Sequence, residues 1–567
     1  MRILLIASGY NSLTQRAEAE LRDRGHTVSV EVTPDEAAVR EAVGRHAPDL
    51  VVAPMLRTVV PRDVWSSRIC LIVHPGPVGD RGPSSLDWAI HDGAAEWGVT
   101  VLQADEEMDA GDVWATAAFR VPEVAKSDLY RNELSDAAMA AVHLAVERVA
   151  AGATPRPQTG PVRARPHLRQ ERRRISWELD TETVLRVLRA ADSQPGVRDE
   201  LLGEEWFLHG GHAEDGLRGR PGELLATRNG AICRATADGA VWIPELRART
   251  GPGGERACKL PATLALALAG RLPELPEPPA PRPLPERGRT WSDIRYQEHG
   301  AVGMLSFAFP GGAMSTDHCR RLLRAYETAC RRPTSVLVLG GQRDFFSNGI
   351  HLGVIEAAAD PAAESWATIN AMNDLVEAVL TTTDRLVVSA IGGNAAAGGV
   401  MLALAADEVW CRSGAVLNPH YRRMGLSGSE YWTHTLPRRV GPALAERLTR
   451  AARPVSASAA RSMGLVDRVV ACGPAEFAAE MTRLAARLAA HPGTPRRVAA
   501  KKAEYEAREA STPLAAYREQ ELSRMRAIFD DPAAPYHALR RAFARKEGKA
   551  AGSGGLRDAG AAGPADR

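Results

Sequence analysis

A proline-rich segment near the middle of the chain, residues 272–290, divides the sequence into two halves. It reads LPELPEPPAPRPLPERGRT and contains seven prolines. Because proline lacks an amide donor and favours extended backbone, such a segment does not join a helix or a sheet interior. The 567 residues also exceed the length at which a single core stops growing, about 250–300 residues. The sequence therefore predicts a semi-rigid spacer between separately folded parts.

A weaker break lies at residues 152–175, which lack apolar periodicity. Together the two breaks predict a first domain over residues 1–152, a second over 153–271 and the spacer over 272–290. A third domain should then occupy residues 291–547. The last residues, 548–567, are rich in Gly and Ala and should form a disordered tail.

Bulk composition excludes several classes of protein. Hydrophobic residues make up 45% of the chain and the net charge is +2, which argues for a globular protein and against a dedicated nucleic-acid binder. The seven cysteines are scattered without a CxxC pair, so neither a disulfide framework nor a metal site is expected. The apolar run at the N-terminus is too short for a signal peptide, and no stretch reaches the roughly 18 residues of a membrane helix. We expect a cytoplasmic protein that binds no membrane.

The first half alternates short apolar runs with amphipathic stretches, as α/β proteins do. Strands are predicted at 3–7, 28–32, 50–53 and 69–73, and helices at 16–24 and 36–45. This alternation predicts a doubly wound parallel sheet, whose ligands lie outside the carboxyl ends of the strands. Residues 176–262 contain short strand-like runs between Gly and Asn turns, at 223–226, 231–235 and 240–243. They predict a small β-rich subdomain.

The second half is predicted to be α/β with a helical C-terminal part. Strands are expected at 302–309, 335–339 and 386–391, and a helix at 316–330 with Leu322, Leu323 and Tyr326 on one face. A further helix opens at 397–406, directly after a strand. The remaining helices are expected at 442–451, 456–463 and 474–491, followed by one long charged helix near 494–528.

A histidine and an aspartate of the first half stand at turns that can bring them together. His74 follows the strand at 69–73 and precedes Pro-Gly-Pro, and Asp109 lies in the later Asp-Ala-Gly-Asp turn. A His–Asp pair at the carboxyl edge of a sheet can carry and orient a proton.

The string around this pair is His-Pro-Gly, Arg-Gly, Ala-Ile, Gly-Val-Thr-Val and Asp-Ala-Gly-Asp, and it resembles the folate-dependent formyltransferases over residues 1–150. Residues 176–262, with Ile-Ser-Trp at their start, resemble the C-terminal (OB-like) subdomain of that family. The resemblance implies 10-formyltetrahydrofolate as formyl donor, with His74 and Asp109 as catalytic residues and Ile72, Arg81 and Gly82 beside the folate.

Ile72 departs from the family pattern. The family has an Asn-x-His pair, and Ile72 occupies the asparagine position. Isoleucine cannot donate a hydrogen bond to a developing oxyanion, and loss of one such donor costs roughly 100- to 1000-fold in rate. We therefore expect slower transfer, a different donor, or an acceptor more nucleophilic than an amine, such as a thiol.

Two glycine-rich turns of the second half form another candidate site. One is Ser-Asn-Gly-Ile-His around Gly349, and the other is Ala-Ala-Ala-Gly-Gly, which opens a helix after the strand at 386–391. Glycine allows backbone amides to approach a ligand closely, and two such amides can hold an oxyanion.

The spacing of these turns resembles the crotonase (enoyl-CoA hydratase/isomerase) superfamily over residues 295–530. The resemblance implies coenzyme A thioesters as ligands, oxyanion-holding amides at Ile350 and Gly398, and a lining that includes Gly349 and Gly399. The acid/base carboxylates of hydratases are absent, since their positions fall on Met401 and His420. Polar residues of the segment 418–432 are the candidates to line this site: His420, Tyr421, Ser429, Glu430 and Tyr431.

The fusion of these two halves is similar to a family of maturation proteins for nickel–iron hydrogenases. That resemblance implies formyl transfer from 10-formyltetrahydrofolate to coenzyme A, then decarbonylation of formyl-CoA to carbon monoxide for the hydrogenase iron. His420, Tyr421 and Glu430 remain unranked as the base that removes the formyl proton. Folate, coenzyme A and hydrogenase maturation proteins are the implied partners.

Three alternatives remain open at this point. A bifunctional sugar-nucleotide formyltransferase needs a nucleotide site, and the second half has no GxGxxG fingerprint. An acyl-CoA hydratase or hydrolase needs the missing carboxylates. A non-catalytic maturation scaffold is disfavoured by the intact His74 and Asp109.

Overall fold

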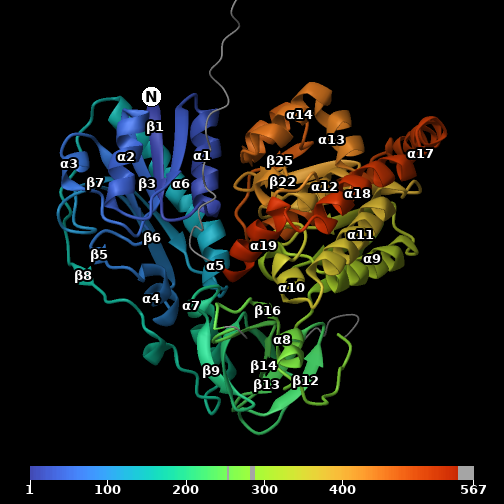
Figure 1. Cartoon of the computed structure of the whole chain (residues 1–567), viewed down its shortest axis with the longest axis horizontal. Coiled ribbons are helices and arrows are strands. Elements are labelled where there is room, and N and C mark those ends of the chain that lie inside the picture. Colours follow the sequence, from blue (N-terminus) through green and yellow to red (C-terminus); the bar gives the residue numbers. More distant parts are fainter. Residues whose placement is uncertain (252–253, 281–287, 547–567) are drawn as a thin grey trace, which may run out of the picture.

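The computed structural model describes residues 1–251, 254–280 and 288–546. It has three parts that follow one another along the chain (Figure 1). The N-terminal part lies on one side, the C-terminal part on the other, and the small β-rich part lies beneath and between them. No helix within the described residues is long and apolar enough to cross a membrane. The predicted tail and residues 281–287 of the predicted spacer lie outside the described residues.

The N-terminal part is a six-stranded sheet in the order β2-β1-β3-β4-β6-β7. The first four strands along the chain are parallel, and β6 and β7 add antiparallel strands beyond β4. Their bounds are β1 Arg2–Ala7, β2 Thr27–Val32, β3 Leu50–Met55, β4 Cys70–His74, β6 Glu96–Gln103 and β7 Val113–Arg120. The strands predicted at 3–7, 28–32, 50–53 and 69–73 are all present.

Alternate residues of β1 supply two separate cores, because successive side chains of a strand point to opposite faces. Ile3 and Leu5 pack with α1 (Ser12–Asp23) and α6 (Ser135–Ala150). Leu4 and Ile6 pack with α2 (Glu36–His46) and α3 (Arg62–Trp65). Helices on both faces of a largely parallel sheet confirm the doubly wound fold.

Two four-stranded antiparallel sheets form the β-rich part, in the orders β16-β15-β10-β9 and β11-β14-β13-β12. The strands are β9 Val197–Leu201, β10 Glu204–His209, β11 His212–Glu214, β12 Leu224–Arg228, β13 Ala231–Ala235, β14 Ala240–Ile243, β15 Glu245–Ala248 and β16 Leu260–Pro261. Helices α7 (Thr181–Ala191) and α8 (Ala262–Leu268) share its core.

The proline-rich segment is packed against this part over its first residues. Residues 272–280 form neither helix nor strand. The amide of Thr227 donates to the carbonyl of Pro276, and the guanidinium of Arg228 donates to that of Pro278. The carbonyls of an extended proline segment remain available as acceptors, so it can be attached to β12 without joining a sheet.

The C-terminal part contains a six-stranded sheet in the order β17-β18-β19-β20-β22-β25, parallel except for β17. Its strands are β17 Ile294–His299, β18 Val302–Phe307, β19 Val336–Gly340, β20 Leu386–Ile391, β22 Glu408–Arg412 and β25 Arg468–Val470. A second sheet, β21-β23-β24, consists of Ala395–Ala396, Val416–Asn418 and Val455–Ser456.

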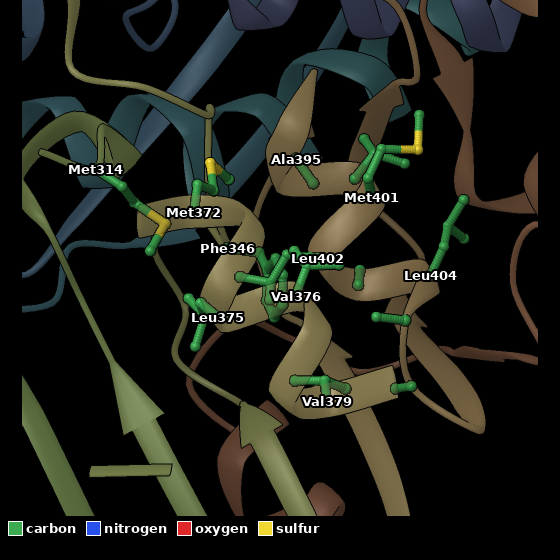
Figure 2. Close-up of a cluster of buried hydrophobic side chains, with 14 of the residues drawn as sticks. Met314, Phe346, Met372, Leu375, Val376, Val379, Ala395, Met401, Leu402 and Leu404 are labelled. Atoms are coloured by element: carbon green, nitrogen blue, oxygen red, sulfur yellow. The ribbon is translucent and has the colours of Figure 1, made fainter. Parts of the chain in front are cut away.

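The helices around the larger sheet bury the main core of this part. Figure 2 shows side chains of α11 (Pro361–Leu380) and α12 (Gly398–Leu404) in this core, with Val376 next to Leu402. Helix α9 (Thr316–Cys330) lies beside α11 and has the predicted bounds. The remaining helices include α10 Leu352–Ala357, α13 Trp432–Val440, α14 Pro442–Ala451, α15 Ala457–Met463 and α16 Phe477–Ala490.

The single charged helix predicted near 494–528 is wrong, because two helices occupy this region. Helix α17 (Thr494–Ser511) ends before Pro513, and α18 (Leu514–Asp530) begins after it. Thr512 is extended, with φ −144° and ψ 102°, as a residue before proline prefers. A last helix, α19 (Pro535–Arg545), then returns toward the other two parts (Figure 1).

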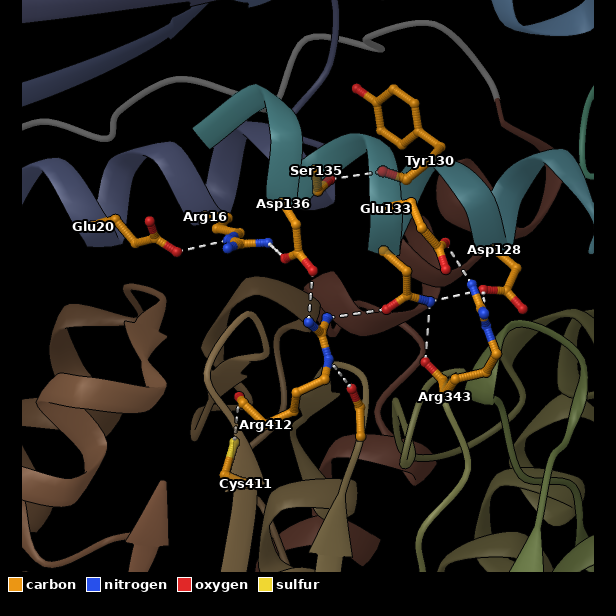
Figure 3. A network of polar contacts seen from close by, with 12 residues as sticks. Arg16, Glu20, Asp128, Tyr130, Glu133, Ser135, Asp136, Arg343, Cys411 and Arg412 are labelled. Carbon is orange, nitrogen blue, oxygen red and sulfur yellow. Dashed lines mark hydrogen bonds and ion pairs between the residues drawn. The ribbon is translucent and has the colours of Figure 1, made fainter. Parts of the chain in front are cut away.

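Buried polar contacts join the N-terminal and C-terminal parts (Figure 3). Arg412 at the end of β22 donates to Asp136 at 2.9 Å and to the side-chain oxygen of Asn132 at 3.0 Å. Arg343 donates to Asp128 at 2.9 Å and to Glu133 at 2.6 Å. Because these acceptors lie on one continuous helical segment of the N-terminal part, the network fixes how the two parts meet.

Candidate active sites

The first site is centred on His74, the last residue of β4. Its Nδ1 lies 3.2 Å from a carboxylate oxygen of Asp109, and the side chains are 4% and 10% exposed. The structure thus brings together the two residues that the sequence pattern placed at separate turns. His74 ends β4, which runs parallel to β3, so the ring lies at the carboxyl edge of the parallel strands.

A second carboxylate contacts the same ring. Asp80, at the start of β5 (Asp80–Arg81), places Oδ2 3.0 Å from His74 Nε2. Burial opposes the charged imidazole, but the hydrogen bonds and charges of Asp109 and Asp80 outweigh it and raise the pKa of His74 to about 9. Burial likewise acts to raise the pKa of Asp109, and the contacts with His74 outweigh it and lower that pKa. Asp80 was not predicted from the sequence, although it directly precedes the Arg-Gly of the motif.

Backbone contacts hold Asp109 in place. The amide of Gly82 donates to Asp109 Oδ2 at 3.1 Å, and Gln158 donates to the Asp109 carbonyl at 2.9 Å. Gly82 has φ +118°, and a Cβ there would lie 2.2 Å from the Arg165 carbonyl oxygen. This position therefore requires glycine. Gln158 and Arg165 belong to the aperiodic segment 152–175, whose role at this site no local pattern indicates.

The remaining predicted residues of the first site surround this pair. Ile72 lies two residues before His74 on β4, so both side chains point to the same face of the sheet. Ile72 is half-buried and, like Leu56 and Trp65, packs against an aliphatic cluster. Arg81 forms an ion pair with Glu107 at 2.5 Å.

The second site lies in a cavity of about 1240 Å³ that all three parts of the chain border. It exceeds the usual 300–1000 Å³ of a small-molecule site. Gly349, Ile350, Gly398, His420, Tyr421 and Glu430 line it, and so do Tyr10, Asn11, Gln15 and Arg131 of the N-terminal part. The lining does not include His74, Asp80 or Asp109.

The two glycine-rich turns meet at this cavity. A Cβ on Gly349, which has φ +78°, would lie 3.5 Å from the amide nitrogen of Gly398. Across the described residues, the amides of Ile350 and Gly398 donate to no protein acceptor. Gly398 is the first residue of α12, where an N–H group has no intrahelical partner. Two free amides at adjoining turns are suited to hold a thioester carbonyl oxygen.

A carboxyl group and a phenol lie beside these amides. Tyr421 donates to Glu430 Oε2 at 2.7 Å, and both side chains are buried. A Cβ on Gly398 would lie 2.7 Å from the carboxyl carbon of Glu430. Burial raises the pKa of Glu430 to about 7, although hydrogen bonds from Tyr421 and Ser429 act in the opposite direction.

Glu430 is held there by a strained backbone. Glu430 and Tyr431 have φ +60° and +58°, a region that residues with side chains rarely adopt. The Glu430 amide donates to the side chain of Asn373 at 3.2 Å. The Tyr431 and Thr433 amides donate to the two carboxylate oxygens of Glu521. These contacts stabilise the strained turn, and strained backbone clusters at functional sites.

His420 lines the cavity as a neutral ring. Burial, together with the charge of Arg423, lowers its pKa to about 4, and its Nδ1 is buried without a partner. Met401, the other position where hydratases have a carboxylate, is fully buried in the apolar core and absent from the cavity lining (Figure 2).

Three other predicted residues lie outside the cavity lining. A Cβ on Gly399 would lie 2.1 Å from the Ser347 carbonyl oxygen, so this glycine permits close packing. Ser429 is buried and accepts from Asn373 at 3.2 Å. Tyr431 is buried, and its hydroxyl donates to Glu377 at 2.8 Å.

The stretches of chain that contain the two sites match known protein families. The formyl transferase family matches residues 31–146, and the formyl transferase C-terminal domain matches residues 167–253. The enoyl-CoA hydratase/isomerase family matches residues 300–535. A methionyl-tRNA formyltransferase of Variovorax paradoxus is 29% identical over 229 residues, which cover 39% of this chain and 70% of that protein.

Two relatives extend over nearly the whole chain. The hydrogenase maturation factor HoxX of Bradyrhizobium diazoefficiens is 49% identical, covering 96% of this chain and 95% of its own. The crystal structure of HypX from Aquifex aeolicus in complex with tetrahydrofolic acid is 42% identical, with a TM-score of 0.92 and 96% of each chain covered. With formyltransferase and crotonase-like parts in one polypeptide, the chain belongs to the HypX/HoxX family of hydrogenase maturation factors.

Proposed function

We propose that the chain transfers a formyl group from 10-formyltetrahydrofolate to coenzyme A and then decarbonylates formyl-CoA to carbon monoxide. The carbon monoxide would supply the iron ligand of a maturing nickel–iron hydrogenase. The observation that carries the second step is the position of Glu430, whose carboxyl group packs against Gly398, the residue that carries one of the two free amides of the cavity.

The first step needs folate near His74 and a thiol as acceptor. The HypX relative was crystallised with tetrahydrofolic acid, and the formyltransferase pair His74–Asp109 is formed in this chain at 3.2 Å. The coenzyme A thiolate attacks the formyl carbon, a C–S bond forms, and the bond from that carbon to N10 breaks as N10 takes up a proton.

Coenzyme A suits the large cavity in size and charge. Its phosphates need cationic partners, and seven basic residues line the cavity: Arg131, Arg189, Lys259, Arg289, Arg295, Arg423 and Lys546. Both halves border this cavity, so coenzyme A bound there would contact the formyltransferase-like part as well as the crotonase-like part.

The second step needs a base for the formyl proton and release of a thiolate. The amides of Ile350 and Gly398 hold the carbonyl oxygen, and the Glu430 carboxylate takes the proton from the formyl carbon. The electron pair of that C–H bond forms carbon monoxide as the C–S bond breaks, and the thiolate regains a proton from Glu430. With a pKa of about 7, Glu430 is ionised in a large share of molecules near neutrality, which suits a general base.

The test combines purified protein with 10-formyltetrahydrofolate and coenzyme A, with haemoglobin as a spectroscopic trap for carbon monoxide. We expect carboxyhaemoglobin only when protein, folate donor and coenzyme A are all present. Hydrolysis to formate without carbon monoxide would instead favour an acyl-CoA hydrolase.

A further inference from the structure

The His74 ring lies between two buried carboxylates, one on each nitrogen. Asp80 Oδ2 is 3.0 Å from Nε2, and Asp109 Oδ1 is 3.2 Å from Nδ1. The side chains of His74 and Asp80 are 4% and 2% exposed. Ionised carboxylates only accept hydrogen bonds, and a neutral imidazole donates only one. Two such acceptors are therefore satisfied together only by an imidazolium or by a protonated carboxyl group.

We propose that Asp80 is a positioning residue that keeps His74 as an imidazolium, so that formyl transfer begins with a cation at this point. This role rests on the formyl transfer proposed above. In chemical terms, the proposal means that His74 acts first as a proton donor. It gives its proton to N10 as the C–N bond breaks, and it is reprotonated from solvent, which takes up the proton that the coenzyme A thiol loses when it ionises before the attack.

The local backbone is built around the Asp80–His74 contact. A Cβ on Gly76 would lie 2.3 Å from Asp80 Oδ2 and 2.5 Å from His74 Nε2, so any larger residue would separate the two groups. The other oxygen of Asp80, Oδ1, is buried without a partner. His74 is therefore the side chain that compensates this carboxylate, which ties the position of the ring to its charge.

The other charged and polar groups around His74 are consistent with a protonated ring. Asp109 is the second carboxylate on the ring, and Arg81 is close enough to help lower the pKa of Asp109. Glu107 forms an ion pair with Arg81 and is 73% exposed, so its charge is screened. The neighbouring Thr100 of β6 is uncharged and donates to the Gly76 carbonyl at 2.8 Å. The pKa of about 9 for His74 agrees with a ring that stays protonated near neutrality.

A positive charge on His74 also relates to the family's asparagine, whose position is occupied by Ile72 in this chain. Ile72 shares the sheet face of His74 and cannot donate to the formyl oxygen. A fixed positive charge in a buried site stabilises a developing oxyanion without a further donor. Asp80 thereby supplies, through His74, part of what the formyltransferase asparagine provides.

The first test is a nuclear magnetic resonance titration of the full chain with carbon-13-labelled histidine. His74→Gln assigns the signal, and Asp80→Asn keeps the shape while removing the charge. We expect His74 to titrate near pH 9 in the wild type and lower by roughly 1 unit or more in Asp80→Asn. Asp92→Asn, which removes an aspartate from a histidine outside the site, should leave the His74 titration unchanged.

The titration decides the role of Asp80 independently of turnover. A wild-type His74 that titrates below pH 7 would overturn the proposal, even if Asp80→Asn fails to fold. An unchanged titration in a folded Asp80→Asn protein would overturn it as well. If wild-type protein forms no formyl-CoA while His74 still titrates near pH 9, the proposed function fails and the protonation role of Asp80 stands.

A kinetic arm measures tetrahydrofolate release with coenzyme A across the pH range. An essential acid loses activity as pH rises through its pKa. We expect the alkaline fall of kcat near pH 9 in the wild type and at correspondingly lower pH in Asp80→Asn. A merely structural role would lower kcat equally at every pH, and that result would contradict the proposal.

Discussion

The carboxyl group of Glu430 packs directly against the α-carbon of Gly398, the residue whose amide is free at the cavity. A Cβ at position 398 would lie 2.7 Å from the Glu430 carboxyl carbon and 2.9 Å from Oε1. Non-bonded heavy atoms prefer about 3.5–4.0 Å, so only glycine leaves room. The proposed base and one proposed oxyanion donor are therefore positioned by the same contact.

Gly398→Ala should displace Glu430 and slow the release of carbon monoxide from synthetic formyl-CoA. Alanine keeps the backbone amide, so the loss comes from misplacing the base, whose contribution is typically roughly 100-fold or more. Gly44→Ala in α2 is the control, because its Cβ meets nothing within 4 Å. If Gly398→Ala is as active as Gly44→Ala, the contact between Gly398 and Glu430 does not position the base.

Release of carbon monoxide from formyl-CoA should rise with pH through about 7, where Glu430 ionises. The carboxylate is the base, so the activity is lost as pH falls below the pKa of Glu430. Glu430→Gln should lose roughly 100- to 10,000-fold, the usual contribution of a general base. A flat pH profile, or a fully active Glu430→Gln protein, would assign the base elsewhere.

Tyr421→Phe should move this profile to higher pH and slow the reaction. The Tyr421 hydroxyl donates to Glu430 at 2.7 Å and acts to lower the pKa of that carboxyl group. Without it, a smaller share of Glu430 is ionised near neutrality. Tyr326→Phe is a matched control, since it removes a buried hydroxyl that contacts Thr382 in the core. If the midpoint of the pH profile does not move in Tyr421→Phe, the Tyr421 hydroxyl does not influence the pKa of the base.

His74→Ala and Asp109→Asn should each abolish formyl transfer while leaving decarbonylation of added formyl-CoA intact. Both residues lie outside the cavity lining, and they are the proposed proton-carrying pair of the first site, in contact at 3.2 Å. Tetrahydrofolate release measures the first step, and circular dichroism checks the fold. Full transfer activity in either variant would exclude that residue from the catalytic set.

Crotonyl-CoA should not be hydrated. The two positions where hydratases have carboxylates are a core methionine, Met401, and a neutral histidine, His420. Loss of the crotonyl absorbance on incubation with the protein would show that the second half retains ordinary hydratase chemistry.

Local patterns predicted the regular elements well and failed where tertiary context decides. The amphipathic stretch 316–330 and the apolar run 386–391 became α9 and β20 with the same bounds. Helix α11 was not predicted, because apolar residues cover much of its surface and leave no distinct stripe. The long helix at 494–528 was wrong because Pro513 was overlooked as a break.

The site residues show the same division. His74, Asp109 and the two glycine-rich turns belong to motifs that can be read along the chain. Asp80 and Gln158 are brought to the first site by contacts across β5 and the segment after α6, which no local period encodes. The ranking of His420, Tyr421 and Glu430 as candidate bases also required the three-dimensional structure, because it depends on which side chain lies beside Gly398.

The most direct measurement follows the formyl carbon itself. 10-Formyltetrahydrofolate labelled with carbon-13 at the formyl group is incubated with the protein, coenzyme A and haemoglobin, and the haem-bound carbon monoxide is examined by infrared spectroscopy. The account predicts labelled carbon monoxide that requires coenzyme A and disappears in both His74→Ala and Glu430→Gln. Labelled formate without labelled carbon monoxide, or labelled carbon monoxide formed equally well without coenzyme A, would contradict it.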